Sequence, residues 1–285
     1  MIKKFILRCT IFISCFIMII FMAWHFITYN RAALCKTEAN ILFLGNSRIQ
    51  YGINDQLIPN SLNVGLNADN YVFSYLKLKL LKKYNPQIDT LILGYDKATL
   101  THYFQISDEK FHPFFWDLLD FDDWIFFLKY DTKIFMSPLN WLKILYPIKS
   151  HIGDFKFQNL GIGGYNDLYR DKLPEAIQQY QKTNSSIKAD ELQEKYLKKI
   201  VSFCSNNDIQ IVFLNMPSHP ITYVQSEDEY LNQYARSHYS NIPYWDYEFI
   251  ELPDSCYGDL THINYRGAKA LSYILNQNHF NIQDK

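Results

Sequence analysis

Short apolar runs alternate along most of the chain with stretches that have helical periodicity. The apolar runs predict short strands that are buried on both faces of a sheet. They lie at 41–44, 62–65, 90–93 and 209–214, and a weaker strand is expected at about 243–247.

The segments between these runs repeat their apolar residues at helical spacing. Leu192, Tyr196 and Ile200 recur at every fourth position and predict one buried helical face. Further helices are expected at 71–84 and at 265–275. Strands that alternate with helices predict the α/β class, here a three-layer sandwich around a mainly parallel sheet of about five strands.

The middle section, at about 100–187, interrupts this alternation. It is rich in aromatic residues, as in FHPFFWDLLDFDDWIFFLKY, and it holds the cluster Gly161-Ile162-Gly163-Gly164. No Lys-Ser or Lys-Thr pair follows these glycines, so they predict a turn and not a phosphate-binding loop. We expect the section to be an insertion within a domain of residues 35–285, packed over the sheet edge where ligands bind.

The N-terminal stretch has the pattern of a membrane anchor. Lys3, Lys4 and Arg8 precede an apolar run from Cys9 to Trp24. That run is near the lower limit for crossing a bilayer, about 17 to 25 residues, and no small-x-small cleavage site follows it. The pattern predicts an uncleaved transmembrane helix within residues 1–30. The rest of the chain would then lie on the periplasmic side of the inner membrane, because the basic end stays in the cytoplasm.

Composition narrows the function classes. The 285 residues fit one sizeable domain, or one domain plus a smaller lobe. With 28 basic and 29 acidic residues the net charge is −1, which gives no electrostatic reason to expect nucleic acid. The aromatic content of 17% fills a core, and it also suits stacking against sugar rings.

Two of the five cysteines, Cys204 and Cys256, lie in the body of the expected α/β domain. In an oxidising compartment they allow one disulfide. Cys204 lies on the apolar face of a predicted helix, which equally fits a buried free thiol. No pair of cysteines has zinc-site spacing, and the sequence predicts no metal and no cofactor.

Candidate catalytic residues flank the predicted sheet. Ser47 follows the first strand, and Asp259 and His262 directly precede the last helix. A serine nucleophile needs an imidazole to take its proton and a carboxylate to orient that imidazole. These three residues therefore predict a Ser-His-Asp set. Each part also has a simpler interpretation, since Gly-Asn-Ser-Arg is an ordinary turn and Asp259 can cap a turn.

Two further residues are candidates for substrate binding. Ligands of open α/β sheets bind at the carboxyl ends of the strands. Asp96 follows the third predicted strand and His219 follows the fourth. A histidine between Ser218 and Pro220 also fits a loop residue with no contact to substrate.

The strand-end motifs resemble the SGNH (GDSL-type) hydrolase superfamily. FLGNSR is similar to its first block, SLNVGLNADN to its second, and GDLTHINYRGAKAL to its fifth, which is the strongest match. The resemblance extends across the strand ends of the folded body. It implies Ser47 as nucleophile, His262 as base, Asp259 as its partner, and the backbone N–H groups of Ser47 and Gly65 as oxyanion donors.

The sequence departs from the family pattern at two places. Asn46 replaces the Asp of the first block, and Asp96 stands where the third block has an Asn that completes the oxyanion hole. Losing one such donor costs on the order of a hundred- to a thousandfold in rate. Asn67, two residues past Gly65, is the candidate substitute.

The resemblance implies an acyl esterase or O-acyltransferase that acts on an envelope or exported glycan. The anchored layout is similar to the D-alanyl-lipoteichoic acid transfer proteins and the alginate O-acetylation proteins. The alternative is a non-catalytic protein of the same fold that binds glycan or a membrane acyltransferase partner. The missing third-block Asn favours this alternative, whereas Ser47, Asp259 and His262 favour the enzyme.

Overall fold

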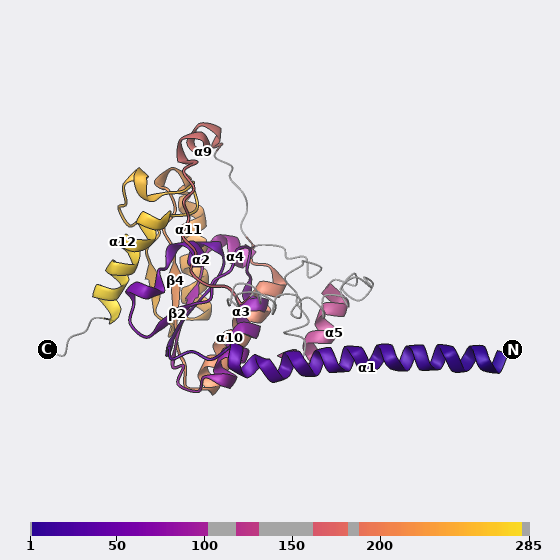
Figure 1. Ribbon diagram of the computed structural model, residues 1–285. Coiled ribbons are helices and arrows are strands. Elements are labelled where there is room, and N and C mark those ends of the chain that lie inside the picture. Colours follow the sequence, from indigo (N-terminus) through magenta and orange to yellow (C-terminus); the bar gives the residue numbers. More distant parts are fainter. Residues whose placement is uncertain (1, 102–117, 131–161, 182–187, 281–285) are drawn as a thin grey trace. The chain divides into compact units, whose positions relative to one another are not determined.

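A computed structural model of the chain describes residues 2–101, 118–130, 162–181 and 188–280 (Figure 1). The chain divides into two compact units, residues 1–36 with 105–161 and residues 37–104 with 162–285. Most of the expected insertion lies outside the described residues. Its last part, from Ile162 onward, belongs to the second unit and not to a separate lobe.

The second unit is built on a five-stranded sheet in which every pair of neighbours is parallel. The strand order is β2-β1-β3-β4-β5. The strands are β1 (Ile41–Leu44), β2 (Ser61–Asn63), β3 (Thr90–Gly94), β4 (Gln210–Asn215) and β5 (Tyr244–Asp246). The predicted α/β class with a parallel sheet is confirmed. The second strand ends earlier than expected, so that Val64 and Gly65 lie in the loop after it.

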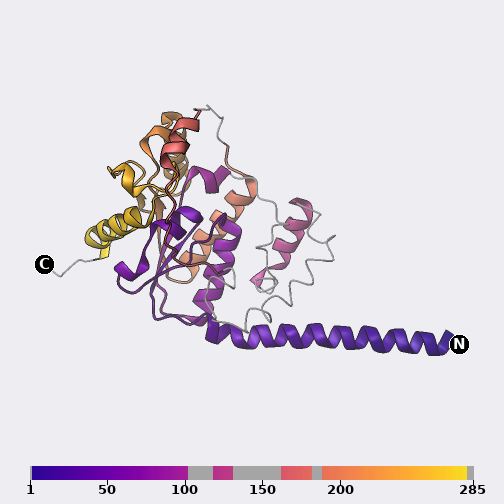
Figure 2. The same cartoon turned by 45° about the horizontal axis from the view of Figure 1, so that its top comes forward.

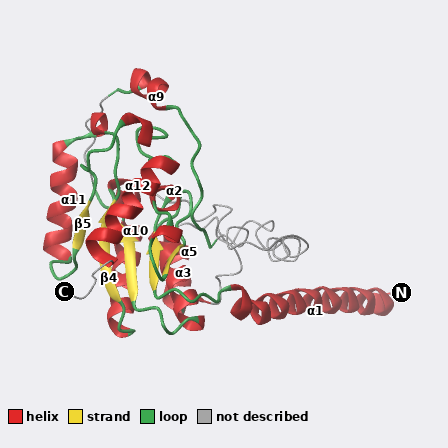
Figure 3. Cartoon of the chain, turned by 60° about the vertical axis from the view of Figure 1, so that its left-hand side comes forward, coloured by secondary structure: helices red, strands yellow, loops and turns green. Residues whose placement is uncertain are grey.

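Helices cover both faces of this sheet (Figure 3). On one face α2 (Ser47–Gly52) and α12 (Tyr265–Leu275) pack together, and their apolar residues join those of alternate strand positions such as Phe43 in one core. On the other face α3 (Tyr71–Tyr84) and α10 (Glu191–Asn206) lie against each other (Figure 2). Strands covered on both sides explain why the strand sequences are continuously apolar.

Side-chain caps fix where three of the helices begin. Asn70 accepts hydrogen bonds from the N–H groups of the first turn of α3, Asp190 does so for α10, and Asn264 does so for α12. Such caps satisfy backbone donors that have no partner within the helix. The described residues of this unit also form α4 (Lys97–Thr101), α9 (Leu173–Gln179) and α11 (Gln225–His238), besides short 3-10 and π helices.

The cysteines of this unit are free thiols. Cys204 and Cys256 are both buried and form no disulfide, so the free-thiol alternative applies to them. Burial raises the pKa of Cys204 to about 12. The thiol is therefore protonated at neutral pH and behaves as a small apolar side chain.

In the first unit the structure describes two helices, α1 (Ile2–Leu34) and α5 (Phe121–Tyr130). The sequence predicted a transmembrane helix in this region. Within the described residues, no helix is both long enough and apolar enough to cross a membrane.

Candidate active site

A glycine turn places Ser47 at the carboxyl end of β1. Gly45 has a φ of +153°, and a Cβ there would lie 2.7 Å from Ile49 Cγ1 and 3.3 Å from the Gly94 Cα. Glycine is the residue that tolerates both this backbone and this close approach. The chain therefore turns at once from strand into helix, and Ser47 becomes the first residue of α2, partly exposed at the sheet edge.

The predicted histidine and aspartate meet Ser47 from the other end of the chain. Ser47 Oγ lies 2.8 Å from His262 Nε2. His262 Nδ1 in turn lies 3.0 Å from Asp259 Oδ1 and 3.1 Å from Asp259 Oδ2. With Nδ1 protonated and donating to the carboxylate, Nε2 is free to accept the serine proton. The three side chains have the order and spacing of a Ser-His-Asp relay.

Asp259 is held by donors on several sides. Its Oδ1 accepts from the N–H groups of Thr261 and His262, each at 2.9 Å, and from Thr261 Oγ1 at 3.1 Å. Arg170 Nη1 lies 3.1 Å from its Oδ2. Burial acts to raise the pKa of Asp259, but the hydrogen bonds from His262 and Thr261 outweigh it and bring the pKa well below its usual value. The carboxylate therefore stays ionised and orients the imidazole.

Arg170 was not a candidate in the sequence, because it lies in the section that we expected to be an insertion. The segment around Arg170 is hydrogen-bonded to the loop that carries Asp259 and His262. Lys172 N–H donates to Gly258 O at 3.0 Å, and Tyr265 N–H donates to Leu168 O at 3.2 Å. These backbone bonds place Arg170 beside Asp259.

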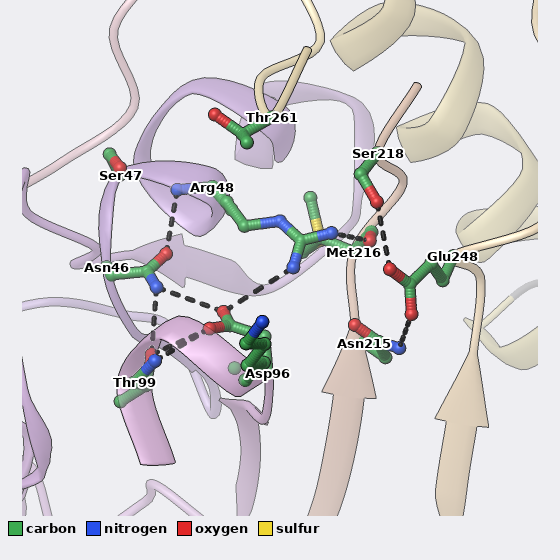
Figure 4. A network of polar contacts seen from close by, with 12 residues as sticks. Asn46, Ser47, Arg48, Asp96, Thr99, Asn215, Met216, Ser218, Glu248 and Thr261 are labelled. Atoms are coloured by element: carbon green, nitrogen blue, oxygen red, sulfur yellow. Dashed lines mark hydrogen bonds and ion pairs between the residues drawn. The ribbon is translucent and has the colours of Figure 1, made fainter. Parts of the chain in front are cut away.

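Asp96 does not have the environment of a substrate ligand. It is 2% exposed and accepts hydrogen bonds from Asn46 Nδ2 at 3.0 Å and from the Thr99 N–H at 2.8 Å (Figure 4). Arg48 Nη1 lies 3.9 Å away, and another nitrogen of the same guanidinium donates to the Met216 carbonyl. Asp96 thus joins the turn before Ser47 to the end of β3. Its predicted contact with substrate is not supported, because the chain's own donors surround it.

Asn46 completes this network on the side of the serine. Its Oδ1 accepts the Arg48 N–H at 2.8 Å and caps α2, while its Nδ2 donates to Asp96 and, at 2.8 Å, to Thr99 Oγ1. Both functional groups of the amide are therefore used. A carboxylate at this position could still accept the Arg48 N–H, but it could not donate to Asp96.

The expected oxyanion donors are partly occupied. The Gly65 N–H donates to Asn63 Oδ1 at 2.8 Å, and a Cβ on Gly65 would lie 2.6 Å from the Gln50 nitrogen. A side chain at position 65 would clash with Gln50, so the close packing requires glycine there. The Gly65 N–H already donates to Asn63 and is therefore not available to an oxyanion. The Asn67 N–H donates to Gln50 Oε1 at 2.7 Å. Asn67 is exposed, and it does not line the cavity that opens beside Ser47. The Ser47 N–H, as the first of a helix, has no partner within that helix.

The glycine cluster of the middle section packs against this loop. Gly164 N–H donates to Gly65 O at 3.0 Å. Gly163 has a φ of +100°, and a Cβ on it would lie 2.4 Å from the same oxygen. Residues 162–170 form an irregular loop in which no turn is assigned, so the predicted turn is not seen at these two glycines, and Gly161 lies outside the described residues.

A cavity of about 410 Å³ opens beside the relay. Ser47, Thr261 and His262 line it, together with the charged residues Arg48, Lys97, Glu227, Asp228 and Glu248. The sequence did not single out these charged residues, since they come from loops and helices that only the fold brings together. Among the described residues no group of three or more His, Cys, Asp or Glu side chains could hold a metal ion.

His219 lies outside this cavity lining. Its Nε2 is 3.3 Å from Asp254 Oδ1, and its ring meets Tyr257 edge-on with centroids 5.2 Å apart. Its Nδ1 accepts from the Ile221 N–H at 3.4 Å. Because the ring organises its own loop, the predicted role in substrate binding is not supported.

Comparisons with known proteins leave the family open. A protein-family model matches residues 168–283, which is less than half of the chain. No curated protein matches the chain. Five chains of solved structures do match, among them a protein provisionally named a platelet activating factor from Streptococcus pneumonia. It is 13% identical with a TM-score of 0.43, over 94% of this chain and 98% of that one.

The Asn46–Asp96 contact predicts the effect of placing a second acid at position 46. Asn46→Asp would place two carboxylates about 3 Å apart in a buried site and remove the amide donor. We expect a loss of about 3 kcal/mol in the free energy of unfolding at pH 7. The folded-state pKa of the pair is raised, so the loss should shrink as the pH falls toward the unfolded value of about 3.9. Urea unfolding across this pH range measures it.

A double variant and a surface variant control this experiment. Asn46→Asp combined with Asp96→Asn again pairs one amide with one carboxylate and should recover most of the lost stability. Asn241→Asp, at an exposed position, should change stability by less than about 0.5 kcal/mol. Equal stability of Asn46→Asp and wild type at pH 7 would show that this contact does not hold the turn.

Proposed function

We propose that the protein is a serine esterase or O-acyltransferase of the SGNH type, with Ser47 as nucleophile, His262 as general base and Asp259 as its orienting partner. One observation supports this most strongly. Ser47 Oγ, the His262 imidazole and the Asp259 carboxylate form a continuous hydrogen-bonded chain at the mouth of a cavity.

The reaction follows from this arrangement. His262 Nε2 takes the proton of Ser47 as Oγ attacks the carbonyl carbon of an acyl ester, and a tetrahedral intermediate forms. The Ser47 N–H donates to the oxyanion of that intermediate. His262 then gives the proton to the departing alcohol, and the acyl group remains on Ser47. Water or a sugar hydroxyl then attacks the acyl carbon while His262 takes its proton. When this second intermediate breaks its bond to Ser47, His262 returns the proton to Ser47 Oγ, and the acid or the new ester leaves.

The substrate class rests on the resemblance of the sequence motifs, which favours an acylated envelope or exported glycan. The enzyme would need no cofactor, because the chemistry uses side chains and water alone. Its partners would be the glycan and a membrane acyltransferase that supplies or receives the acyl group.

A non-catalytic glycan-binding or partner-binding protein of the same fold is the second candidate. A specific observation favours it: the Gly65 N–H is already bonded to Asn63, and Asp96 occupies the third-block position of the Asn donor. Of the two expected backbone donors, the Gly65 N–H is therefore occupied, and the Ser47 N–H has no partner within its helix. The two candidates differ in whether Ser47 is needed for turnover.

We further propose that α1 attaches the protein to the inner membrane, with the α/β unit on the periplasmic side. The apolar run from Cys9 to Trp24 and its basic flank support this. Large apolar side chains along α1 face outward, with Phe5 67%, Phe12 72% and Phe21 69% exposed. Apolar surface of this extent is unfavourable in water and is stabilised by a lipid environment.

Removing either side chain of the proton-transfer pair should abolish turnover. Ser47→Ala and His262→Ala should each lower kcat for p-nitrophenyl acetate at least about a thousandfold, since the relay acts as a unit. The melting temperature should change little, because each change removes few contacts. Release of p-nitrophenol by the purified chain measures the rate.

Ser205→Ala is the matched control, since Ser205 is exposed on α10 and far along the chain from the relay. It should hydrolyse the ester as wild type does. Unchanged hydrolysis and transfer in Ser47→Ala would contradict the proposed serine enzyme and favour the non-catalytic binding protein.

Membrane attachment through α1 predicts that charges on this helix release the protein. Phe12→Lys with Phe16→Lys should move the full chain from the carbonate-washed membrane fraction to the supernatant, because each lysine costs about 2.5–3.5 kcal/mol in a bilayer. Phe121→Lys, on α5 and 78% exposed, should leave the fractionation unchanged. A reporter at the C-terminus that is active in the cytoplasm alone would contradict the proposed orientation.

A further inference from the structure

The cavity beside Ser47 extends to a second group of polar residues. Asn215 at the end of β4, Asp228 on α11 and Glu248 after β5 line it, and we call these three residues the acidic arm. Figure 4 shows Asn215 and Glu248 on the far side of the Arg48 side chain from Ser47. One ligand in this cavity can therefore reach both the nucleophile and the acidic arm.

The positive charges of the cavity are already used elsewhere. Arg48 is paired with Asp96, and Lys97 forms an ion pair with Glu227. Within the described residues, the two carboxylates of the acidic arm have no cationic partner. The arm therefore keeps an excess of negative charge.

The two carboxylates are held in place by neutral donors. Glu248 accepts from Asn215 Nδ2 and from Ser218 Oγ, each at 2.9 Å. Asp228 accepts from Asn232 Nδ2 at 3.1 Å. Burial and then the nearby Glu248 carboxylate raise the pKa of Asp228. A cation between the two carboxylates would relieve this repulsion.

The amide of Asn215 supplies an observation that is independent of the two carboxylates. Its side chain is fully buried, and its Nδ2 donates to Glu248 and, at 3.2 Å, to Asp246 Oδ1, which fixes the orientation of the amide. Its Oδ1 is buried without a hydrogen-bond partner. In Figure 4 this oxygen points away from Glu248. A buried acceptor without a donor is unfavourable, so the site is suited to a ligand that brings an N–H group.

We propose that the acidic arm binds a positively charged ammonium group of the substrate while the acyl ester lies at Ser47. This inference rests on the proposed esterase or acyltransferase function and adds the charge of the substrate to it. An ammonium group has three N–H donors, which match Asn215 Oδ1 and the carboxylates of Asp228 and Glu248. Tyr223, Val224 and Leu231 line the same cavity and would pack against the carbon atoms next to the nitrogen.

Equilibrium titration of the full chain with n-butylammonium, monitored by NMR, tests ligand binding at the acidic arm without turnover. Wild type should bind n-butylammonium at least tenfold more tightly than 1-butanol, in which a hydroxyl replaces the ammonium. Asp228→Asn with Glu248→Gln should weaken amine binding at least tenfold. Glu251→Gln, which removes an exposed carboxylate outside the cavity, should bind as wild type does.

Ser47→Ala separates this inference from the proposed function. It should retain amine binding although it loses ester hydrolysis. If wild type hydrolyses no ester but binds the amine as expected, the proposed function fails and the ammonium site stands. Equal affinity for amine and alcohol, amine binding unaffected by the double variant, or occupation of the arm by Ca²⁺ in place of the amine would overturn the inference.

Discussion

All five strands run in the same direction, and this single constraint brings the site together. The carboxyl ends of parallel strands meet at one edge of a sheet, so residues far apart in the sequence become neighbours there. Ser47 follows β1 near the start of the α/β unit, and His262 precedes α12 near its end. Their hydrogen bond of 2.8 Å depends on both elements keeping their places against the same core.

The edge of the sheet is made rigid by buried polar contacts. Asn46, Asp96, Thr99 and Arg48 bond to one another beneath the nucleophile, and each lies on the turn or helix that follows β1 or β3. Burying a carboxylate such as Asp96 is unfavourable unless donors surround it. Because those donors come from two neighbouring strand ends, the same bonds that satisfy Asp96 also fix the direction of Ser47. This explains why position 46 has an amide and not a carboxylate, because a second acid there would remove the Nδ2 group that donates to Asp96.

Local pattern was enough to predict the strands, the helices α3, α10 and α12 and the residues of the relay, whereas α11 was not predicted. Gly45 and Ser47 directly follow an apolar run, and Asp259 and His262 are close enough in sequence to lie on one loop. Each of these features can therefore be seen within a short segment of the sequence. The roles of Gly65, Asp96 and His219 depend on which donor or acceptor lies opposite, and no sequence spacing shows that Asn63 faces the Gly65 N–H. Arg170 was missed for the same reason. Its neighbour Asp259 is contributed by a loop that is distant in sequence, and Arg170 lies in the section at about 100–187, whose break in the alternation of strands and helices suggested an insertion.

The account centres on Ser47 as a nucleophile that His262 activates, and covalent labelling tests this most directly. The full chain is incubated with a fluorophosphonate, digested, and mapped by mass spectrometry. We expect one adduct, on the peptide that contains Ser47, and its rate of formation should fall at least about a hundredfold in His262→Ala. A chain that takes up no label at Ser47, or that labels equally fast without His262, would contradict the account.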